Sequence, residues 1–377
     1  MRTIATILVL FLIQCTYLRA EINHVPAMGK FTESCIFGVK SVSLYLYNSH
    51  VTGEMVPDNE LCNNIDPSQP VTFVVHGFTS YANSSQTRDL AMQLKHKSTV
   101  FAMDWSQAAC KDGIPILKYT GYYSAVINTR EIGHLLANYT ITLNKQCGVP
   151  LEKITYFGHS LGAHVCGFAG KNIKSLGFEI ELIIGADPAR PLFSGNKPED
   201  RLCDSDAKRL VVFHTSQLGM AIPMGDLDLY FNGGQNQPGC GLNFFACPHS
   251  RAIAYLTNIL KNNCGFPGVS DSSSSYPNSN TTDCIMVNSN VLDCNSSMKG
   301  KYYVFVDEHS YCTKETFSCK QIRKFARSLI AINLLSISDP AEMSLVCGCA
   351  VVLGCGLFNC PVVEGAAKPG GGCIAQC

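Results

Sequence analysis

The stretch Ile154-Thr-Tyr-Phe-Gly-His-Ser-Leu-Gly-Ala-His-Val-Cys-Gly-Phe-Ala-Gly170 joins an apolar run to a helical pattern through a Gly-flanked turn, with Ser160 at its apex. Residues 158–162 fit the G-x-S-x-G pattern, in which a strained turn exposes a serine hydroxyl at the top of a sheet. The bare pattern is a weak signal. Its context strengthens it, because an apolar run at residues 154–157 precedes it and residues 161–176 carry apolar side chains at helical spacing without proline. We therefore predict a nucleophile elbow at Ser160.

Apolar runs alternate with helical stretches through most of the chain. Strands are predicted at residues 71–76, 100–105, 154–157, 181–185, 209–214 and 302–306, and helices at residues 88–96, 122–143, 161–176 and 252–261. Several of the strands are nearly continuous in apolar residues, which is typical of strands buried on both faces. The alternation predicts an α/β fold with a mostly parallel sheet flanked by helices.

Residues 1–20 are predicted to be a secretory signal peptide that is removed after Ala20. Arg2 precedes an apolar core at residues 4–13, which is too short to span a bilayer. The chain has 29 Lys+Arg and 29 Asp+Glu, and loss of Arg2 and Arg19 leaves it near neutral. Near-neutrality argues against a nucleic-acid partner. We expect a secreted, extracellular protein.

The cysteine content supports that compartment. Twenty cysteines are typical of a chain that folds under oxidising conditions, and their irregular spacing argues against zinc. Only Cys15 falls in the signal peptide, so at least one thiol is left free or pairs between chains. Cys166 is the candidate for a free thiol or a small buried hydrophobe. Four N-x-S/T sites predict glycosylation: Asn83, Asn138, Asn280 and Asn295.

Residues 313–377 differ in composition from the domain predicted for residues 21–312. Residues 320–335 suggest an amphipathic helix, and residues 343–363 carry no charge. A run of that length is long enough to span a membrane. Its glycines, its cysteines and Pro361 favour instead a disulfide-stapled or irregular tail.

Ser160 requires a base, an orienting carboxylate and oxyanion donors, because a serine alcohol at its free pKa is a poor nucleophile. In this fold the chain order is serine, acid, histidine. Asp187 follows an apolar run and precedes Pro188, which should hold it extended at the carboxyl end of a strand. The later Asp204 and Asp206 lie in a polar stretch typical of a solvated loop. We therefore predict Asp187 as the acid.

Three histidines remain as candidates for the base: His214, His249 and His309. His214 ends a predicted strand, where a histidine can also be a satisfied structural residue. His249 lies in a cysteine-anchored loop before a predicted helix. His309 lies in a polar segment beyond the last predicted strand and is the weakest candidate. The residues alone leave His214 and His249 open.

Six motifs resemble those of the pancreatic lipase family, from about Cys35 to Cys312. In chain order they are VVHGF, GHSLGAHVCGFAGK, GADPARP, FHTS, DLYFNGGQNQPGC and CPHSRA. Within that family the chain is most similar to the secreted insect phospholipases A1 of the wasp-venom type. The resemblance implies an α/β-hydrolase fold, with Ser160 as nucleophile, Asp187 as acid and His249 as base. It also implies an oxyanion hole formed by the backbone N–H groups of Phe78 and Leu161.

The resemblance further implies two disulfides, Cys35–Cys110 and Cys240–Cys247. The second closes a loop of six residues at the family's lid position, far shorter than the lid of its triacylglycerol lipases. The loop after the FHTS motif is also short, and the family's C-terminal β-sandwich has no counterpart. Within the family, these departures favour a phospholipase A1 that releases the sn-1 fatty acid. Acyl transfer by the serine, histidine and acid proceeds through an acyl-enzyme and calls for no metal or organic cofactor.

Two alternatives remain open. One is a triacylglycerol or galactolipid lipase of the same family, and the other is a non-catalytic lipid-binding relative. The intact set of Ser160, Asp187 and His249 argues against the second. The expected partner is a phospholipid or another lipid ester at a membrane or aggregate surface, which Leu242, Phe244 and Phe245 are candidates to touch. We expect a monomer.

Overall fold

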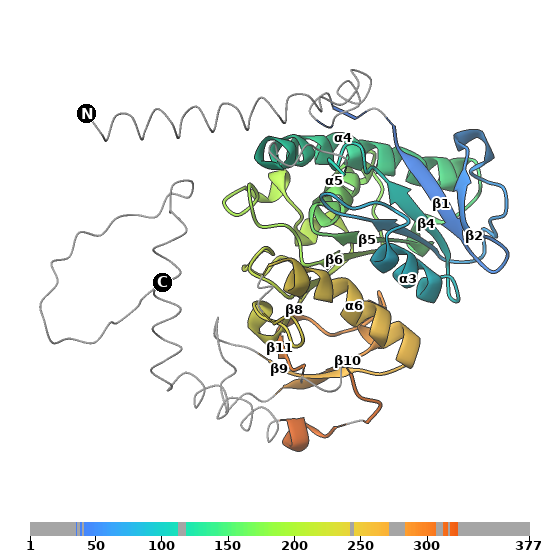
Figure 1. Ribbon diagram of the computed structural model, residues 1–377. Coiled ribbons are helices and arrows are strands. Elements are labelled where there is room, and N and C mark those ends of the chain that lie inside the picture. The colour runs from blue at the N-terminus through green and yellow to red at the C-terminus, as the bar shows by residue number, and fades with distance from the viewer. Residues whose placement is uncertain are drawn as a thin grey trace, which may run out of the picture. The chain divides into compact units, whose positions relative to one another are not determined.

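The computed structural model describes residues 35, 38–39, 41–111, 118–241, 245–270, 283–306, 312–315 and 317–322. The described strands form one sheet in the order β10-β9-β11-β8-β7-β6-β5-β3-β4-β1-β2 (Figure 1). From β4 through β3, β5, β6, β7 and β8 to β11, neighbouring strands are parallel. The strands at both ends pair antiparallel. The predicted α/β fold with a mostly parallel sheet is therefore confirmed.

The bounds of the elements are as follows. The strands are β1 (Ser43–Tyr47), β2 (Thr52–Val56), β3 (Val71–Val75), β4 (Thr99–Asp104), β5 (Ile154–His159), β6 (Leu182–Ala186), β7 (Arg209–His214), β8 (Leu227–Phe231), β9 (Phe266–Ser270), β10 (Cys284–Val287) and β11 (Gly300–Val304). The α-helices are α3 (Ser85–Leu94), α4 (Lys118–Lys145), α5 (Leu161–Ser175) and α6 (Ala246–Asn262).

Helices cover both faces of the sheet. Helix α4 packs beside α5, and α3 packs beside α6 (Figure 1). Successive strand residues point to opposite faces, so Phe73 and Val75 of β3 enter the core that includes residues of α4 and α5. Val74 enters the other core, which includes residues of α3 and α6. The central strands are thus buried on both sides, as their apolar runs predicted.

Helix α6 begins earlier than predicted, and this corrects the position of His249. The helix starts at Ala246, so His249 lies in its first turn and not in a loop before it. Pro248 concealed this start in the sequence. Proline is tolerated in the first turn of a helix, where backbone N–H groups have no helical partner.

Five disulfides join described cysteines: Cys35–Cys110, Cys62–Cys147, Cys240–Cys247, Cys264–Cys312 and Cys284–Cys319. The first and third are the pairings that the family resemblance implied. Cys166, Cys203 and Cys294 are the described cysteines without a disulfide. The Cys166 thiol is buried, and burial raises its pKa.

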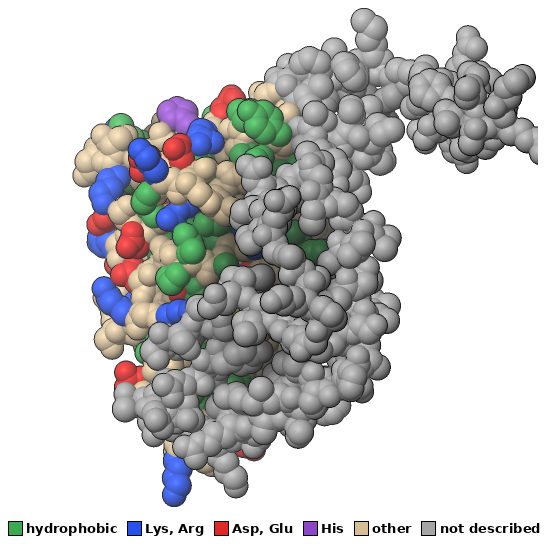
Figure 2. Space-filling view, turned by 90° about the vertical axis from the view of Figure 1, so that its left-hand side faces the viewer, with side chains coloured by type: hydrophobic (Ala, Val, Ile, Leu, Met, Phe, Trp, Pro, Cys, Tyr) green, Lys and Arg blue, Asp and Glu red, His purple; other side chains and the backbone are tan. Residues whose placement is uncertain are grey.

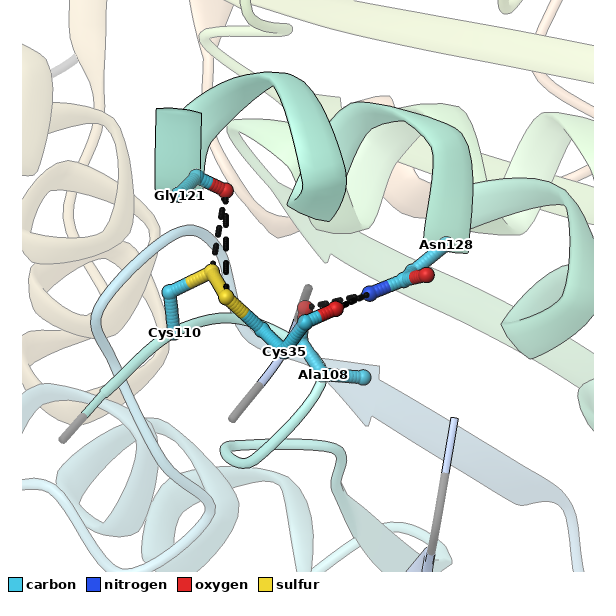
Figure 3. Close-up of a disulfide and its surroundings, with 5 residues drawn as sticks. All are labelled: Cys35, Ala108, Cys110, Gly121 and Asn128. Carbon is cyan, nitrogen blue, oxygen red and sulfur yellow. Dashed lines mark hydrogen bonds between the residues drawn. A yellow bond between two sulfur atoms is a disulfide. The ribbon is translucent and has the colours of Figure 1, made fainter. Parts of the chain in front are cut away.

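The Cys35–Cys110 bond joins Cys35 to the loop after β4, beside Gly121 of α4 (Figure 3). Both sulfurs lie close to the carbonyl oxygen of Gly121, and Asn128 Nδ2 donates to the carbonyls of Cys35 and Ala108 at 3.0 Å each. The loop after β4 also contacts the segment that follows β3: the Thr79 N–H donates to the Ala109 carbonyl at 2.8 Å.

Several predictions fall outside the described residues. They concern the signal peptide at residues 1–20, the tail from residue 323 onward, His309, Asn280, Leu242 and Phe244. In the described ranges, no helix has the length and apolarity required to cross a membrane. On the described part of the face in Figure 2, acidic and basic side chains are interspersed.

Candidate active site

The carboxyl ends of β3, β5, β6 and β7 meet at one edge of the sheet, because these strands are parallel neighbours. Ligands of open α/β sheets bind at this edge. Each strand is followed there by one part of the predicted site. Phe78 follows β3, Ser160 follows β5, Asp187 follows β6, and the FHTS motif ends just beyond β7.

Ser160 connects β5 to α5 with φ 58° and ψ −121°. This strained conformation, rare for an L-residue, holds the serine at the apex of the turn. Two glycines allow strand and helix to approach. A Cβ at Gly158 would lie 2.3 Å from the Gly162 carbonyl oxygen, and one at Gly162 would lie 2.2 Å from the Val75 carbonyl oxygen. The predicted strand, turn and helix are all present.

Asp187 lies directly after β6 and is fully buried. Its Oδ1 accepts from the backbone N–H groups of Thr215 at 2.7 Å and Ser216 at 3.2 Å. Its Oδ2 accepts from Ser216 Oγ at 2.5 Å. The expectation that Pro188 holds Asp187 extended is wrong, because Asp187 has φ 45°, in the left-handed region that aspartate tolerates.

His249 faces Asp187 across the site, with Nδ1 at 2.6 Å from Oδ2. A carboxylate accepts only, so Nδ1 carries a proton and Nε2 is free to act as an acceptor. His159, the residue before Ser160, donates from Nε2 to the His249 carbonyl at 2.9 Å, and their rings lie 4.6 Å apart. Among the described contacts of His249 there is no hydrogen bond to Ser160, and catalytic hydrogen bonds often tighten only when substrate binds.

His214, the other open candidate for the base, is bound elsewhere. Its Nδ1 contacts the Met220 carbonyl at 2.7 Å, and its Nε2 contacts Asp228 Oδ1 at 2.8 Å. The ring also stacks on Tyr230 at 4.1 Å. Both nitrogens are occupied in a site that solvent does not reach, so His214 has no free nitrogen to accept a proton from Ser160. The structure thus brings His249, and not His214, to the acid.

The prediction that Asp204 and Asp206 lie in a solvated loop is right for Asp204 and wrong for Asp206. Asp204 is exposed, as expected of a solvated loop, but Asp206 is buried and pairs with Lys171 Nζ at 2.5 Å. Burial raises the pKa of Asp206, although the Lys171 charge opposes the shift. Asp206 also accepts from the Cys203 N–H at 2.9 Å, and it packs against α5 at Gly167 and Gly170, beyond the first turn of the helix.

The oxyanion donors implied by the resemblance lie beside the serine. A Cβ at Gly77 would lie 2.7 Å from Ser160 Cβ and 3.3 Å from its Oγ, so the peptide that links Gly77 to Phe78 adjoins the hydroxyl. Leu161 is the first residue of α5, and its N–H is one of the four that a helix leaves without an internal partner. Phe78 has its side chain against Tyr122, with ring centroids 5.1 Å apart.

His76 holds that peptide in place, as a structural residue that positions this loop. Its Nε2 accepts from the Trp105 N–H at 3.1 Å, so its Nδ1 carries the proton and donates to the Gly77 carbonyl at 3.0 Å. The Gly77 carbonyl and the Phe78 N–H belong to one trans peptide and point in opposite directions. The bond from His76 to the carbonyl therefore also fixes the direction of the N–H. Burial lowers the pKa of His76 to about 4, which keeps this ring neutral near pH 7.

Known proteins resemble this chain over most of its length. A family model described as Lipase matches residues 48–303. The chain is 42% identical over 313 residues to a "Phospholipase A1" of Dinoponera quadriceps, covering 78% of this chain and 82% of the relative. It is 39% identical over 349 residues to a "Phospholipase A1" of Solenopsis invicta, covering 85% of this chain and all of the relative. The chain therefore belongs to the lipase family and is a carboxylic ester hydrolase with the α/β-hydrolase fold.

Proposed function

We propose that this protein is a secreted phospholipase A1 that hydrolyses the sn-1 ester of phospholipids. Ser160 is the nucleophile, His249 the general base and Asp187 the orienting acid. The observation that carries the proposal is the contact of 2.6 Å between His249 Nδ1 and Asp187 Oδ2 beside a serine on a strained elbow. Relatives called "Phospholipase A1", at about 40% identity, support the substrate class.

The reaction follows from the placement of these groups. His249 Nε2 takes the proton of Ser160 as Oγ attacks the ester carbonyl, and Asp187 stabilises the imidazolium. The N–H groups of Phe78 and Leu161 bind the oxyanion. The lysophospholipid leaves as an alcohol after His249 returns the proton. Water then attacks the acyl-enzyme with His249 as base, which releases the fatty acid and restores Ser160.

The short loop at the lid position supports a phospholipid substrate. The bond between Cys240 and Cys247 closes a loop of six residues, which has too little chain to cover a long apolar cleft. We expect that so short a loop leaves the site uncovered, with space for a polar head group. Phe245 in this loop is 58% exposed, so its ring is available to a lipid surface.

Secretion and glycosylation belong to the same proposal. Five disulfides are typical of a chain that folds in an oxidising compartment. Three of the four acceptor asparagines are described, and Asn83, Asn138 and Asn295 are all exposed. An exposed side chain is what attachment of a glycan requires.

The test is hydrolysis of phosphatidylcholine that carries different acyl chains at sn-1 and sn-2, compared with long-chain triglyceride at equal interface. We expect the sn-1 fatty acid to be released, at a rate at least tenfold above that for triglyceride, a difference of about 1.4 kcal/mol in the barrier. The Ser160→Ala variant should release neither. Release from sn-2 would contradict the positional assignment, and a preference for triglyceride would favour the lipase alternative.

A further inference from the structure

Ser216 is a buried hydroxyl at the acid end of the triad. It is the last residue of the FHTS motif, two positions beyond the end of β7, and it is 3% exposed. Its Oγ has three polar neighbours. They are Asp187 Oδ2 at 2.5 Å, the Leu218 N–H at 3.1 Å and His249 Nδ1 at 3.3 Å.

The direction of these hydrogen bonds follows from the chemistry of the partners. The Leu218 N–H can only donate, and His249 Nδ1 carries a proton because it faces a carboxylate. The Ser216 hydroxyl therefore accepts from Leu218 and directs its own proton to Asp187 Oδ2. With this bond, Oδ2 accepts one hydrogen bond from Ser216 and one from His249, while Oδ1 accepts two from backbone N–H groups. All four acceptor positions of the carboxylate are occupied.

Besides the Leu218 N–H, which donates to Ser216 Oγ, the loop that carries Ser216 is held by hydrogen bonds that do not use this hydroxyl. The N–H groups of Arg190 and Met220 donate to the carbonyls of Leu218 and Pro188, at 2.7 Å and 2.8 Å. His214 and Asp228 anchor the same loop from the sheet side. The distinctive contact of the Ser216 side chain is thus the one with Asp187.

We propose that Ser216 is a positioning residue for the reaction, whose hydroxyl holds the Asp187 carboxylate so that Oδ2 faces His249. Without it, one oxygen of a fully buried charge loses a donor, and the carboxylate is free to rotate away from Nδ1. Ser216 acts through Asp187 and touches no substrate. The inference rests on the proposed function, because it assumes that Asp187 and His249 serve Ser160.

The test compares Ser216→Ala with Ser250→Ala. Ser250 lies next to His249 and donates to the Ala246 carbonyl at 2.9 Å, so its variant also removes a hydroxyl hydrogen bond, but none to the acid. The kcat and KM of each variant are measured on a soluble short-chain ester. The downfield proton resonance of His249 Nδ1 is recorded in the Ser160→Ala background, where no turnover occurs.

We expect Ser216→Ala to lower kcat at least tenfold, equivalent to about 1.4 kcal/mol, with KM within twofold of the wild type and the Nδ1 resonance displaced. Ser250→Ala should change neither. A folded Ser216→Ala protein with wild-type kcat and an unmoved resonance would overturn the proposal. Failure of Ser216→Ala to fold would also overturn it, since the hydroxyl would then be structural.

Failure of the proposed function gives a different result. If the wild type hydrolyses no ester, or Ser160→Ala is as active as the wild type, the triad assignment fails before Ser216 is considered. If Ser160→Ala alone is inactive while Ser216→Ala matches the wild type, the triad stands and the positioning role is wrong.

Discussion

Gly219→Ala should damage catalysis from a position that bears no reactive group. A Cβ at Gly219 would lie 2.2 Å from Asp187 Oδ1 and 2.6 Å from Cγ, whereas ordinary contact begins at 3.4 Å. Asp187 cannot retreat easily, because four hydrogen bonds hold its carboxylate. One of the two groups must move by about 1 Å, and a misplacement of that size costs on the order of 100-fold in rate.

The assay is kcat on a soluble ester, with Gly195→Ala as the matched control. Gly195 lies in the loop after β6 as Asp187 does, and no atom lies within 4 Å of the Cβ position. We expect about a 100-fold loss for Gly219→Ala and little change for Gly195→Ala. A Gly219→Ala enzyme with normal kcat and an unaltered fold would refute the assignment of Asp187 as the acid.

Three further predictions concern the catalytic residues, the pair of His214 with Asp228, and the buried neutral histidines. Ser160→Ala and His249→Ala should each abolish ester hydrolysis without loss of secretion, and the double variant should be no worse than either, because triad residues act as a unit; additive losses would contradict this. His214→Ala should lower the free energy of unfolding by about 1–3 kcal/mol, since the buried Asp228 carboxylate loses its side-chain hydrogen bond and keeps only those from the N–H groups of Met224 and Gly225; the thermal midpoint should fall accordingly, and an unchanged midpoint would count against it. Stability should also fall in acid, because burial lowers the pKa of His76 to about 4 and of His159 and His164 to about 3. Below about pH 6.5 these histidines bind protons in the unfolded chain but not in the folded one. Each therefore lowers the free energy of unfolding by up to about 1.4 kcal/mol per pH unit, from about pH 6.5 down to its folded pKa. A thermal midpoint that stays constant from pH 6.5 to 4 would contradict the three buried neutral rings.

The sequence predicted the central strands well because burial on both faces leaves a continuous apolar run. It missed β8, where Asp228 interrupts the run; the structure shows that this buried carboxylate pairs with His214. Strand β1 and its neighbour β2, which lies at the edge of the sheet, were also missed. In β2, only two of five residues are partly buried, so no apolar run marks it.

The site residues also differ in how far the sequence could predict them. Ser160 and Asp187 follow local rules, a turn pattern and a position at a strand end, and both could be predicted from neighbouring residues. The choice between His214 and His249 depends on Asp228, which lies 14 positions beyond His214 and beside it only because β7 and β8 pair. Ser216 reaches Asp187 because β6 and β7 are neighbours in the sheet. The FHTS motif drew attention to the segment that contains Ser216, but it does not show that Ser216 contacts Asp187.

The proposed reaction forms one covalent bond that can be detected, the ester between Ser160 Oγ and the sn-1 acyl group. Phosphatidylcholine with distinguishable acyl chains is mixed with the enzyme and quenched in acid within one turnover, and the peptides are then analysed by mass spectrometry. We expect the sn-1 acyl group on Ser160 in the wild type, a much smaller amount in His249→Ala, and none in Ser160→Ala. Fatty acid release without an adduct on Ser160, or an adduct that carries the sn-2 chain, would contradict it.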